Sequence, residues 1–433
     1  MQNNRSLYEL FEGSNGITTD SRNCPKGSIF FSLRGESFNG NTYAASALAS
    51  GCYYAVIDDK NYLVPGDERY ILVDDTLKAL QDLAHHHRKT LGTKVIGITG
   101  TNGKTTTKEL IATVLQQSYN VLYTLGNLNN HIGVPLTLLR LTAEHDIAVV
   151  EMGANHQGEI KKLAEMADPD YGIITNVGKA HLEGFGSFEG VLKTKGELYD
   201  YLRKKEDSLI FIDEDNNYLV QMAEGLNKIS YGTEAHLYIN AKVTGNSPYL
   251  ELEWKVGING NPQVVNTQLI GEYNFTNVLA AITIGYYLGV KKESINRAIN
   301  NYTPHNNRSQ LKKTELNTLI IDAYNANPTS MKASIENFIK MDAPHKMVIL
   351  GDMKELGEES NAEHQKILDM IDNSGFENVV LIGECFNLLN SKYTSYPNVT
   401  DFINIIKENQ PKGMTILIKG SNSIKLNLVI DYL

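Results

Sequence analysis

The chain has 433 residues, of which 42% are hydrophobic and 21% are charged, and its formal net charge at pH 7 is −10. This length exceeds that of one ordinary domain and suits three, and the composition is that of a globular protein. The acidic balance disfavours nonspecific binding to nucleic acid or to a membrane surface, because both require a basic face.

The cysteines and the apolar runs indicate the compartment. Cys24, Cys52 and Cys385 are widely spaced and form no C-x-x-C pair, so neither a disulfide framework nor a zinc site is expected. No apolar run approaches the roughly 20 residues that span a membrane, and residues 1–30 have no signal-peptide core. We therefore expect a soluble, cytoplasmic protein without membrane insertion, and we expect it to be a monomer.

Residues 1–85 form the first predicted block, a small α/β domain. Its strand patterns lie at 28–33, 53–57 and 70–73, and a helical pattern lies at 44–50. A charged helical pattern over 76–90 follows and marks a domain boundary. It contains His85, His86 and His87, which face different directions on a helix and do not easily share one metal ion. We interpret this segment as a solvated helix.

Residues 91–302 form the second block, in which strand and helix patterns alternate. The alternation predicts a mostly parallel sheet wrapped by helices. Its strand patterns lie at 95–99, 147–151, 171–176 and 209–212. Between 235 and 270 the pattern changes to strict alternation and turn residues, which predicts a small antiparallel insertion before a helix over 274–288.

Residues 303–433 form the third block, a predicted Rossmann-like, doubly wound α/β domain. Its predicted strands are 318–322, 347–350, 379–382 and 416–418. Its predicted helices are 331–341, 361–371, 401–409 and 424–432. The predicted fold class is therefore α/β with three domains, the central one resembling a P-loop ATPase.

The most informative segment is Thr-Gly-Thr-Asn-Gly-Lys-Thr-Thr-Thr at 99–107, between a strand pattern and a helical pattern. A glycine-rich turn there cradles phosphate, because backbone N–H groups and the helix N-terminus attract anions. Lys104 can reach the terminal phosphates, and the Thr105 hydroxyl can hold a magnesium ion. Ile98 replaces the first glycine of the general G-x-x-x-x-G-K-[ST] pattern, so this loop is a shorter form. The predicted nucleotide-binding residues here are Gly100, Thr101, Asn102, Gly103, Lys104, Thr105 and Thr106.

Polar residues recur where the predicted strands end, which is where open α/β sheets bind ligands. Glu151 ends the strand at 147–151 and is the predicted magnesium partner of the loop. On local grounds alone, His181 suits a structural role and Lys195 an exposed one. The asparagine-rich segment 127–135 suits either a tight turn or polar contacts to a substrate, and its residues leave both open.

Together these motifs resemble the muramyl (Mur) ligase family, the ATP-dependent amide-forming enzymes of peptidoglycan precursor synthesis, over nearly the whole chain. Four segments are most similar to members that join UDP-N-acetylmuramoyl-tripeptide to D-alanyl-D-alanine (D-Ala-D-Ala). These are residues 127–135, 180–187, 322–331 and 350–357. The resemblance implies that carboxylate activation proceeds through an acyl phosphate. It also implies that residues 1–85 bind the UDP-sugar and that 303–433 closes on ATP and dipeptide, with hinges near 91 and 303.

The resemblance also implies site residues. Lys104, Glu151, His181 and Lys195 would be catalytic, and two Mg²⁺ ions would bind, one held by Thr105 and Glu151, the other by His181 and a carbamoylated Lys195. ATP would also contact Asn274, Asn277, Arg308 and Asp322. The substrates would contact Asp20, Ser21, Arg22, Asn127, Asn129, Asn130, Tyr324, Asn325 and Asn327.

The chain departs from the family pattern at a few positions. A single acid, Asp322, precedes Ala-Tyr-Asn-Ala, where two acids are frequent, and Tyr273 replaces a frequent histidine. Asn307 replaces a glycine, and Asn422 replaces a basic residue. These departures concern contacts to ribose, adenine and dipeptide, and they leave the reaction class unchanged.

Two alternatives remain at this point. One is a sister ligase, or a folylpolyglutamate synthase-like ligase, that adds a single amino acid. The other is a nucleotide-dependent sensor of the same fold. The sequence also leaves open whether the third residue of the tripeptide is lysine or diaminopimelate.

Overall fold

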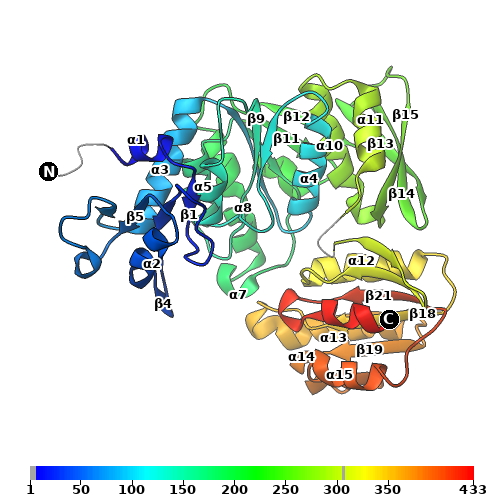
Figure 1. Cartoon of the computed structure of the whole chain (residues 1–433). Coiled ribbons are helices and arrows are strands. Elements are labelled where there is room, and N and C mark those ends of the chain that lie inside the picture. Colours follow the sequence, from blue (N-terminus) through cyan, green and yellow to red (C-terminus); the bar gives the residue numbers. More distant parts are fainter. Residues whose placement is uncertain (1–5, 305–307) are drawn as a thin grey trace. The chain divides into compact units, whose positions relative to one another are not determined.

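The computed structural model describes residues 6–304 and 308–433 (Figure 1). The chain divides into two compact units. The first comprises Met1–Gly97, Tyr119–Gly153 and Glu159–Tyr171, and the second comprises Ile98–Ser118, Ala154–Gly158 and Gly172–Leu433. Asn307, where a family glycine was expected, lies outside the described residues.

The first unit contains a four-stranded parallel sheet in the order β1-β2-β5-β6. Its strands are Ile17–Thr18, Ile29–Phe31, Tyr54–Ile57 and Tyr70–Leu72. Helices α1 (Leu7–Glu12) and α2 (Ala44–Ala49) and the hairpin β3–β4 (Arg34–Gly35, Phe38–Asn39) accompany the sheet. Alternate strand residues such as Phe30, Ala55 and Ile57 pack with α2 in one apolar core.

Helix α3 (Thr76–Leu91) begins at Asp75, whose side chain accepts the Lys78 N–H, and ends at the left-handed Gly92. Interpreting it as a solvated helix was wrong for one face, where His87 and Arg88 are buried. That face packs on α5 (Gly133–Leu138) and α6 (Glu159–Ala167). His87 Nε2 lies 2.9 Å from the Leu141 carbonyl oxygen, so this histidine is a hydrogen-bonded core residue.

Nine strands hydrogen-bond in the order β15-β14-β13-β12-β11-β10-β7-β9-β8. The first six along the chain are β7 Lys94–Thr99, β8 Val121–Tyr123, β9 Ile147–Glu151, β10 Tyr171–Ile174, β11 Leu209–Asp213 and β12 Lys228–Gly232. The predicted antiparallel insertion is β13 Ile239–Asn246, β14 Tyr249–Val256 and β15 Gln263–Ile270. The accompanying helices are α4 Lys104–Leu115, α7 Leu182–Phe185, α8 Phe188–Leu202, α9 Asn217–Met222, α10 Phe275–Tyr287 and α11 Lys292–Asn301.

The last sheet has six strands in the order β16-β17-β21-β18-β19-β20, with β16 antiparallel at one edge. Successive residues of β17, such as Leu319 and Ile320, enter two different apolar clusters, because side chains alternate between the faces of a strand. Both faces are therefore covered, as a doubly wound domain requires. Its strands are Gln310–Lys313, Thr318–Asp322, Lys346–Gly351, Asn378–Ile382, Thr394–Tyr396 and Thr415–Lys419. Its α-helices are α12 Pro328–Lys340, α13 Ser360–Asp372, α14 Glu384–Leu388 and α15 Val399–Ile406.

The predicted helix over 424–432 is wrong in type. The chain forms two 3-10 segments there, η5 (Asn422–Ile424) and η6 (Leu426–Tyr432), separated by Lys425 in a left-handed conformation (φ 59°). One left-handed residue interrupts the i→i−4 hydrogen bonds that an α-helix needs. Nowhere in 6–304 or 308–433 is a helix both long and apolar enough to cross a membrane.

Candidate active site

The phosphate loop between β7 and α4 depends on two glycines with positive φ angles. Gly100 has φ 143°, and a Cβ atom there would lie 2.1 Å from Thr175 Oγ1. Gly103 has φ 76° and begins α4, and a Cβ atom there would lie 2.4 Å from Asn277 Oδ1. Only glycine meets both the conformational and the spatial demand at these positions, which accounts for the spacing in the sequence.

The loop is braced by the segment that follows β10. The Thr101 and Asn102 N–H groups donate to the Asn176 backbone oxygen (3.0 Å) and its Oδ1 (2.9 Å). The Gly178 N–H donates to Thr101 Oγ1 at 3.0 Å. A second set of contacts comes from Asn327, the N-cap residue of α12, whose Nδ2 donates to Asn102 Oδ1 at 2.8 Å. The structure therefore brings together Asn102, predicted to hold phosphate, and Asn327, predicted to contact substrate.

Lys104 folds back over the loop. Its Nζ donates to the backbone oxygens of Gly100 (2.7 Å) and Thr101 (3.0 Å). The amine therefore lies against the loop backbone, and contact with the terminal phosphates stays a prediction. Thr105 and Thr106 occupy the buried first turn of α4, beside the positive end of the helix dipole.

Asn277 and Asn274, predicted to hold adenosine, are buried, and their hydrogen bonds connect α4 with the start of α10. Thr107 Oγ1 donates to Asn277 Oδ1 at 3.0 Å, and Asn277 Nδ2 donates to Asn274 Oδ1 at 2.9 Å. Asn274 Nδ2 in turn donates to the Ile270 backbone oxygen at 2.9 Å. These amides hold the start of α4 in place, and adenosine contact remains a prediction for them.

In the first unit, Glu151 ends β9 and is 1% exposed. Asn129 Nδ2 donates to Glu151 Oε1 at 2.8 Å, so the asparagine-rich turn orients the carboxylate. Asn130 Oδ1 accepts the N–H groups of Ile132 and Gly133 at the start of α5, which accounts for the tight turn. Asn127 is exposed on the same turn, and substrate contact by all three asparagines stays a prediction.

His181 and Lys195 meet at one aromatic ring. Lys195, on α8 and 2% exposed, places its Nζ 5.1 Å from the Phe185 ring centre. The His181 ring packs edge-on against the same phenylalanine, with ring centres 6.0 Å apart. A buried lysine amine is unusual, because burying an ammonium ion is costly without compensating partners. The two residues predicted to hold one metal ion thus lie on the same small segment of the second unit.

The loop after β18 and helix α13, which follows that loop, contact the segment around His181. Lys179 Nζ contacts Glu363 Oε1 at 3.0 Å and Glu359 Oε2 at 3.3 Å. Glu355, in the loop after β18, places its Oε2 2.5 Å from His181 Nδ1. This contact lowers the pKa of the Glu355 carboxyl below its ordinary 4.5. Sequence reasoning missed Glu355, whose motif was noted only for its resemblance to the family.

At the carboxyl edge of the last sheet, Asp322 and Lys419 are register partners on β17 and β21. Lys419, 1% exposed, places its Nζ 2.6 Å from Asp322 Oδ2 and 3.3 Å from the Asn325 backbone oxygen. Nearby, the Arg308 guanidinium stacks on the Tyr324 ring at 3.7 Å. Arg308 Nε is buried and has no hydrogen-bond partner among the described residues. Sequence reasoning missed Lys419 as a site residue.

Asp20, Ser21 and Arg22 lie on an exposed turn of the first unit. The Arg22 guanidinium donates from Nε (2.9 Å) and Nη2 (2.8 Å) to the two carboxylate oxygens of Asp20. These hydrogen bonds lower the pKa of Asp20 from 3.8 to about 2. The pair forms a fixed, planar donor group at the surface, a geometry suited to phosphate or a base edge.

Comparison with known proteins agrees with this geometry. Residues 98–285 match the family model for the Mur ligase middle domain. Residues 307–422 match the model for the Mur ligase glutamate ligase domain, and residues 14–88 match the Mur ligase family catalytic domain. A UDP-N-acetylmuramoyl-tripeptide--D-alanyl-D-alanine ligase from Bacillus subtilis is 36% identical over 426 residues, covering 96% of this chain and 92% of the relative. The chain belongs to the Mur ligase family.

Two solved structures extend the likeness to the fold. A crystal structure of MurF from Acinetobacter baumannii matches with a TM-score of 0.87 and 28% identity, covering 98% of both chains. The MurF ligase from Thermotoga maritima, solved in complex with ADP, matches with a TM-score of 0.85 and 25% identity, covering 98% of this chain and 97% of that one. The predicted family and the three-domain α/β fold are confirmed.

The donor chemistry of this family member fits magnesium. The Glu151 carboxylate and the Thr105 hydroxyl are hard oxygen donors, which Mg²⁺ prefers. His181 and Lys195 both contact the Phe185 ring, and a carbamate on the buried Lys195 amine would provide two oxygen donors. Metal binding by these four residues stays a prediction.

Proposed function

We propose that this chain forms the amide bond between UDP-N-acetylmuramoyl-tripeptide and D-alanyl-D-alanine, with conversion of ATP to ADP and phosphate. The observation that carries the proposal is the position of Lys104, whose amine lies over a strained glycine loop between a strand and a helix. The near full-length likeness to the Bacillus subtilis ligase supports the substrate pair. A cytoplasmic setting for the reaction is part of the proposal, and the three widely spaced cysteines suit a reducing compartment.

The chemistry follows from the poor reactivity of a carboxylate. Attack of a carboxylate oxygen on the γ-phosphorus of ATP forms an acyl phosphate and releases ADP. The dipeptide amine then attacks the acyl carbon, loses a proton and expels phosphate. Phosphoryl transfer needs alignment and charge neutralisation more than covalent help from the protein, and Lys104 with the loop N–H groups supplies both.

Nucleotide binding would extend to the last sheet. Arg308 Nε, buried and without a partner among the described residues, is a donor ready for a ribose or phosphate oxygen. The Lys419 Nζ lies 2.6 Å from Asp322 Oδ2 and holds this carboxylate in place. The Asp322 carboxylate would accept hydrogen bonds from ribose hydroxyl groups. Tyr324, Asn325 and Asn327 follow Asp322 on the same loop and would contact the dipeptide.

Two magnesium ions would be held by Thr105 with Glu151 and by His181 with carbamoylated Lys195. When bound, they neutralise charge on the transferring phosphoryl group and polarise the substrate carboxylate. Asn129 holds Glu151 in one orientation for this task. Carbamoylation is testable by ¹³C NMR in ¹³C-bicarbonate, where the wild-type chain should show a carbamate resonance that the Lys195→Gln variant lacks.

The first unit would bind the UDP-sugar through the exposed Asp20–Arg22 turn, whose guanidinium is held by two hydrogen bonds. Ser21 lies between the two charged residues and would add a hydroxyl contact. Asn127, Asn129 and Asn130 would contact the part of this substrate that reaches Glu151.

A single assay tests the proposed function. The purified chain is incubated with magnesium-ATP, UDP-N-acetylmuramoyl-tripeptide and D-Ala-D-Ala, and product mass and ADP are measured. We expect one ADP per amide product, and ADP release only when both the acid and the amine are present. Activity on the UDP-muramoyl dipeptide with a single amino acid would instead indicate a sister ligase. ATP turnover without either substrate, or none with both, would indicate a sensor.

A further inference from the structure

The contact between Glu355 and His181 joins two strained residues. His181 has φ 51° and Glu355 has φ 64°, and both are left-handed conformations that residues with a Cβ atom rarely adopt. Such strain persists only where the surroundings determine it, and it is frequent at functional sites. Here both strained residues present their side chains to each other, with Glu355 Oε2 2.5 Å from His181 Nδ1.

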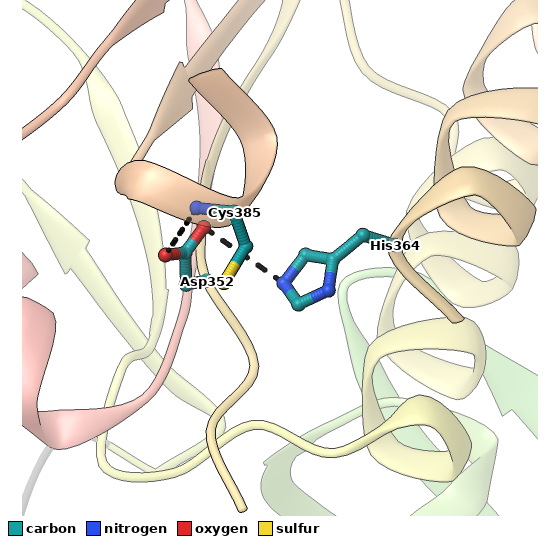
Figure 2. Close-up of side chains that lie close together, drawn as sticks. All are labelled: Asp352, His364 and Cys385. Carbon is teal, nitrogen blue, oxygen red and sulfur yellow. Dashed lines mark hydrogen bonds and ion pairs between the residues drawn. The ribbon is translucent and has the colours of Figure 1, made fainter. Parts of the chain in front are cut away.

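A buried cluster fixes the loop that carries Glu355 (Figure 2). Asp352, 0% exposed, accepts the Cys385 N–H at Oδ2 and the Phe386 N–H at Oδ1, both at 3.0 Å. His364, also 0% exposed, accepts the Met353 N–H at Nε2 (3.0 Å). Asp352 and Met353, which precede Lys354 and Glu355, are therefore held by hydrogen bonds to residues of α13 and α14.

This cluster of Asp352, His364 and Cys385 is not itself a metal site. His364 Nδ1 lies 2.7 Å from the Ser360 backbone oxygen, to which it donates, and Nε2 accepts a backbone N–H. No ring nitrogen therefore retains a free lone pair for a cation. Each Asp352 oxygen is likewise engaged by a backbone N–H. The cluster serves to shape the loop.

Three further contacts hold the loop against the His181 segment. The Glu183 N–H donates to the Glu355 backbone oxygen at 3.4 Å, and helix α7 packs on η4 (Gly357–Glu359). Lys179, two residues before His181, pairs with Glu363 at 3.0 Å. The position of Glu355 is thus set from both sides of the contact.

We propose that Glu355 is a positioning residue for the ligation, acting through His181. At a separation of 2.5 Å, its carboxylate would take the Nδ1–H of His181, which would select one tautomer and leave Nε2 as the ring lone pair for a metal ion. Histidines that bind metal are usually held in this way by a carboxylate on the other ring nitrogen. The inference rests on the proposed function, in which His181 holds magnesium. It adds that the loop after β18 supplies the group that orients this ligand.

The test measures metal affinity without turnover. Mn²⁺ replaces Mg²⁺, and electron paramagnetic resonance counts bound ions in the full chain with a non-hydrolysable ATP analogue. Glu355→Ala should weaken one of the two ions by about 10- to 100-fold. Glu355→Gln should recover most of this affinity, because its amide oxygen still accepts the Nδ1–H. Glu358→Ala, an exposed glutamate in the adjacent turn, should match the wild type and is the control.

A second readout needs no metal. In the chain labelled with ¹⁵N-histidine, His181 should give the imidazole shifts of a single Nδ1–H tautomer, with its signals identified by their absence in His181→Gln. Glu355→Ala should produce a tautomer mixture. Suppose that Glu355→Ala binds Mn²⁺ as tightly as the wild type, or more tightly, while His181→Ala loses one ion. Only the proposed role of Glu355 would then be overturned. Two ions retained in His181→Ala would overturn the proposed metal site and this inference with it.

Discussion

The phosphate loop and the carboxyl edge of the last sheet do related work, yet the chain encodes them differently. In the loop, Gly100, Gly103 and Lys104 lie within five residues and form one local motif, although the atoms that exclude a Cβ atom at the two glycines belong to the distant Thr175 and Asn277. At the sheet edge, Asp322 depends on Lys419, 97 residues away, and this pair exists only because β17 and β21 are adjacent. A local pattern therefore reveals the first region, whereas the second becomes visible only when strand order is known.

The largest expected loss of activity among these stability and kinetic tests is for a variant of the phosphate loop. Gly103→Ala places a Cβ atom 2.4 Å from Asn277 Oδ1, so either the Asn277 side chain, which is hydrogen-bonded to Thr107, or the start of α4 must shift. We expect kcat/KM for ATP to fall by about 100-fold or more, because small displacements of aligned groups have effects of this size. Steady-state kinetics measures the change.

Gly92→Ala is the matched control for that variant. Gly92 also has a positive φ (67°), but a Cβ atom there has nothing within 4 Å. Both variants suffer a similar left-handed penalty of about 1 kcal/mol, so only the loop variant should lose activity. Equal losses in the two variants would show that backbone strain, rather than loop geometry, sets the rate.

The next largest effect is expected for the ion pair between Asp322 and Lys419. Lys419→Met removes a buried cation and leaves the Asp322 carboxylate without its ion-pair partner. We expect the free energy of unfolding to fall by about 3 kcal/mol, measured by urea denaturation. The double variant Asp322→Asn with Lys419→Met should regain most of that stability without regaining ATP affinity. A double variant as unstable as Lys419→Met would contradict the pairing.

A third prediction concerns Asp213, a strand-end acid whose place in the sequence pattern resembles that of Glu151. Asp213 ends β11 as Glu151 ends β9. Burial raises the pKa of Asp213 from 3.8 to about 6. Because the folded-state pKa exceeds the unfolded one, ionisation of Asp213 lowers stability progressively as pH rises from about 4 to 6.

Asp213→Asn should therefore stabilise the chain above pH 6, by up to about 3 kcal/mol. Below pH 4 the gain should vanish, because the wild-type carboxyl is then protonated in both states. Denaturation at pH 5 and pH 8 measures the difference between the two proteins. A gain that is the same at both pH values would show that Asp213 is not destabilised by ionisation.

The smallest expected change in stability is at the exposed Asp20–Arg22 turn. The Asp20 and Arg22 side chains are 46% and 87% exposed, so Arg22→Ala should leave the free energy of unfolding nearly unchanged. Loss of a charge-assisted contact should raise KM for the UDP substrate by roughly 10-fold. A Lys26→Ala variant, at another exposed cation of the same unit, should leave KM unchanged.

The sequence predicted most long elements of this fold, because their apolar periods are regular. It misread the 3-10 segments at the C-terminus, where the left-handed Lys425 has no local signal. It also misread α3, since the burial of His87 depends on α5 and α6. Among the proposed site residues, Lys104 and Glu151 are predicted from local context alone. His181 and Lys195 needed the family resemblance, and Lys419 and Glu355 needed the tertiary structure.

The proposed reaction depends most on the Lys104 amine. Product formation by the wild type and Lys104→Ala, each with saturating magnesium-ATP, UDP-N-acetylmuramoyl-tripeptide and D-Ala-D-Ala, tests it directly by mass spectrometry. Removal of a charged group that stabilises the transferring phosphoryl should lower the rate by about 1,000-fold, while the fold, followed by circular dichroism, stays intact. A Lys104→Ala variant that makes the amide at the wild-type rate would contradict the proposed reaction.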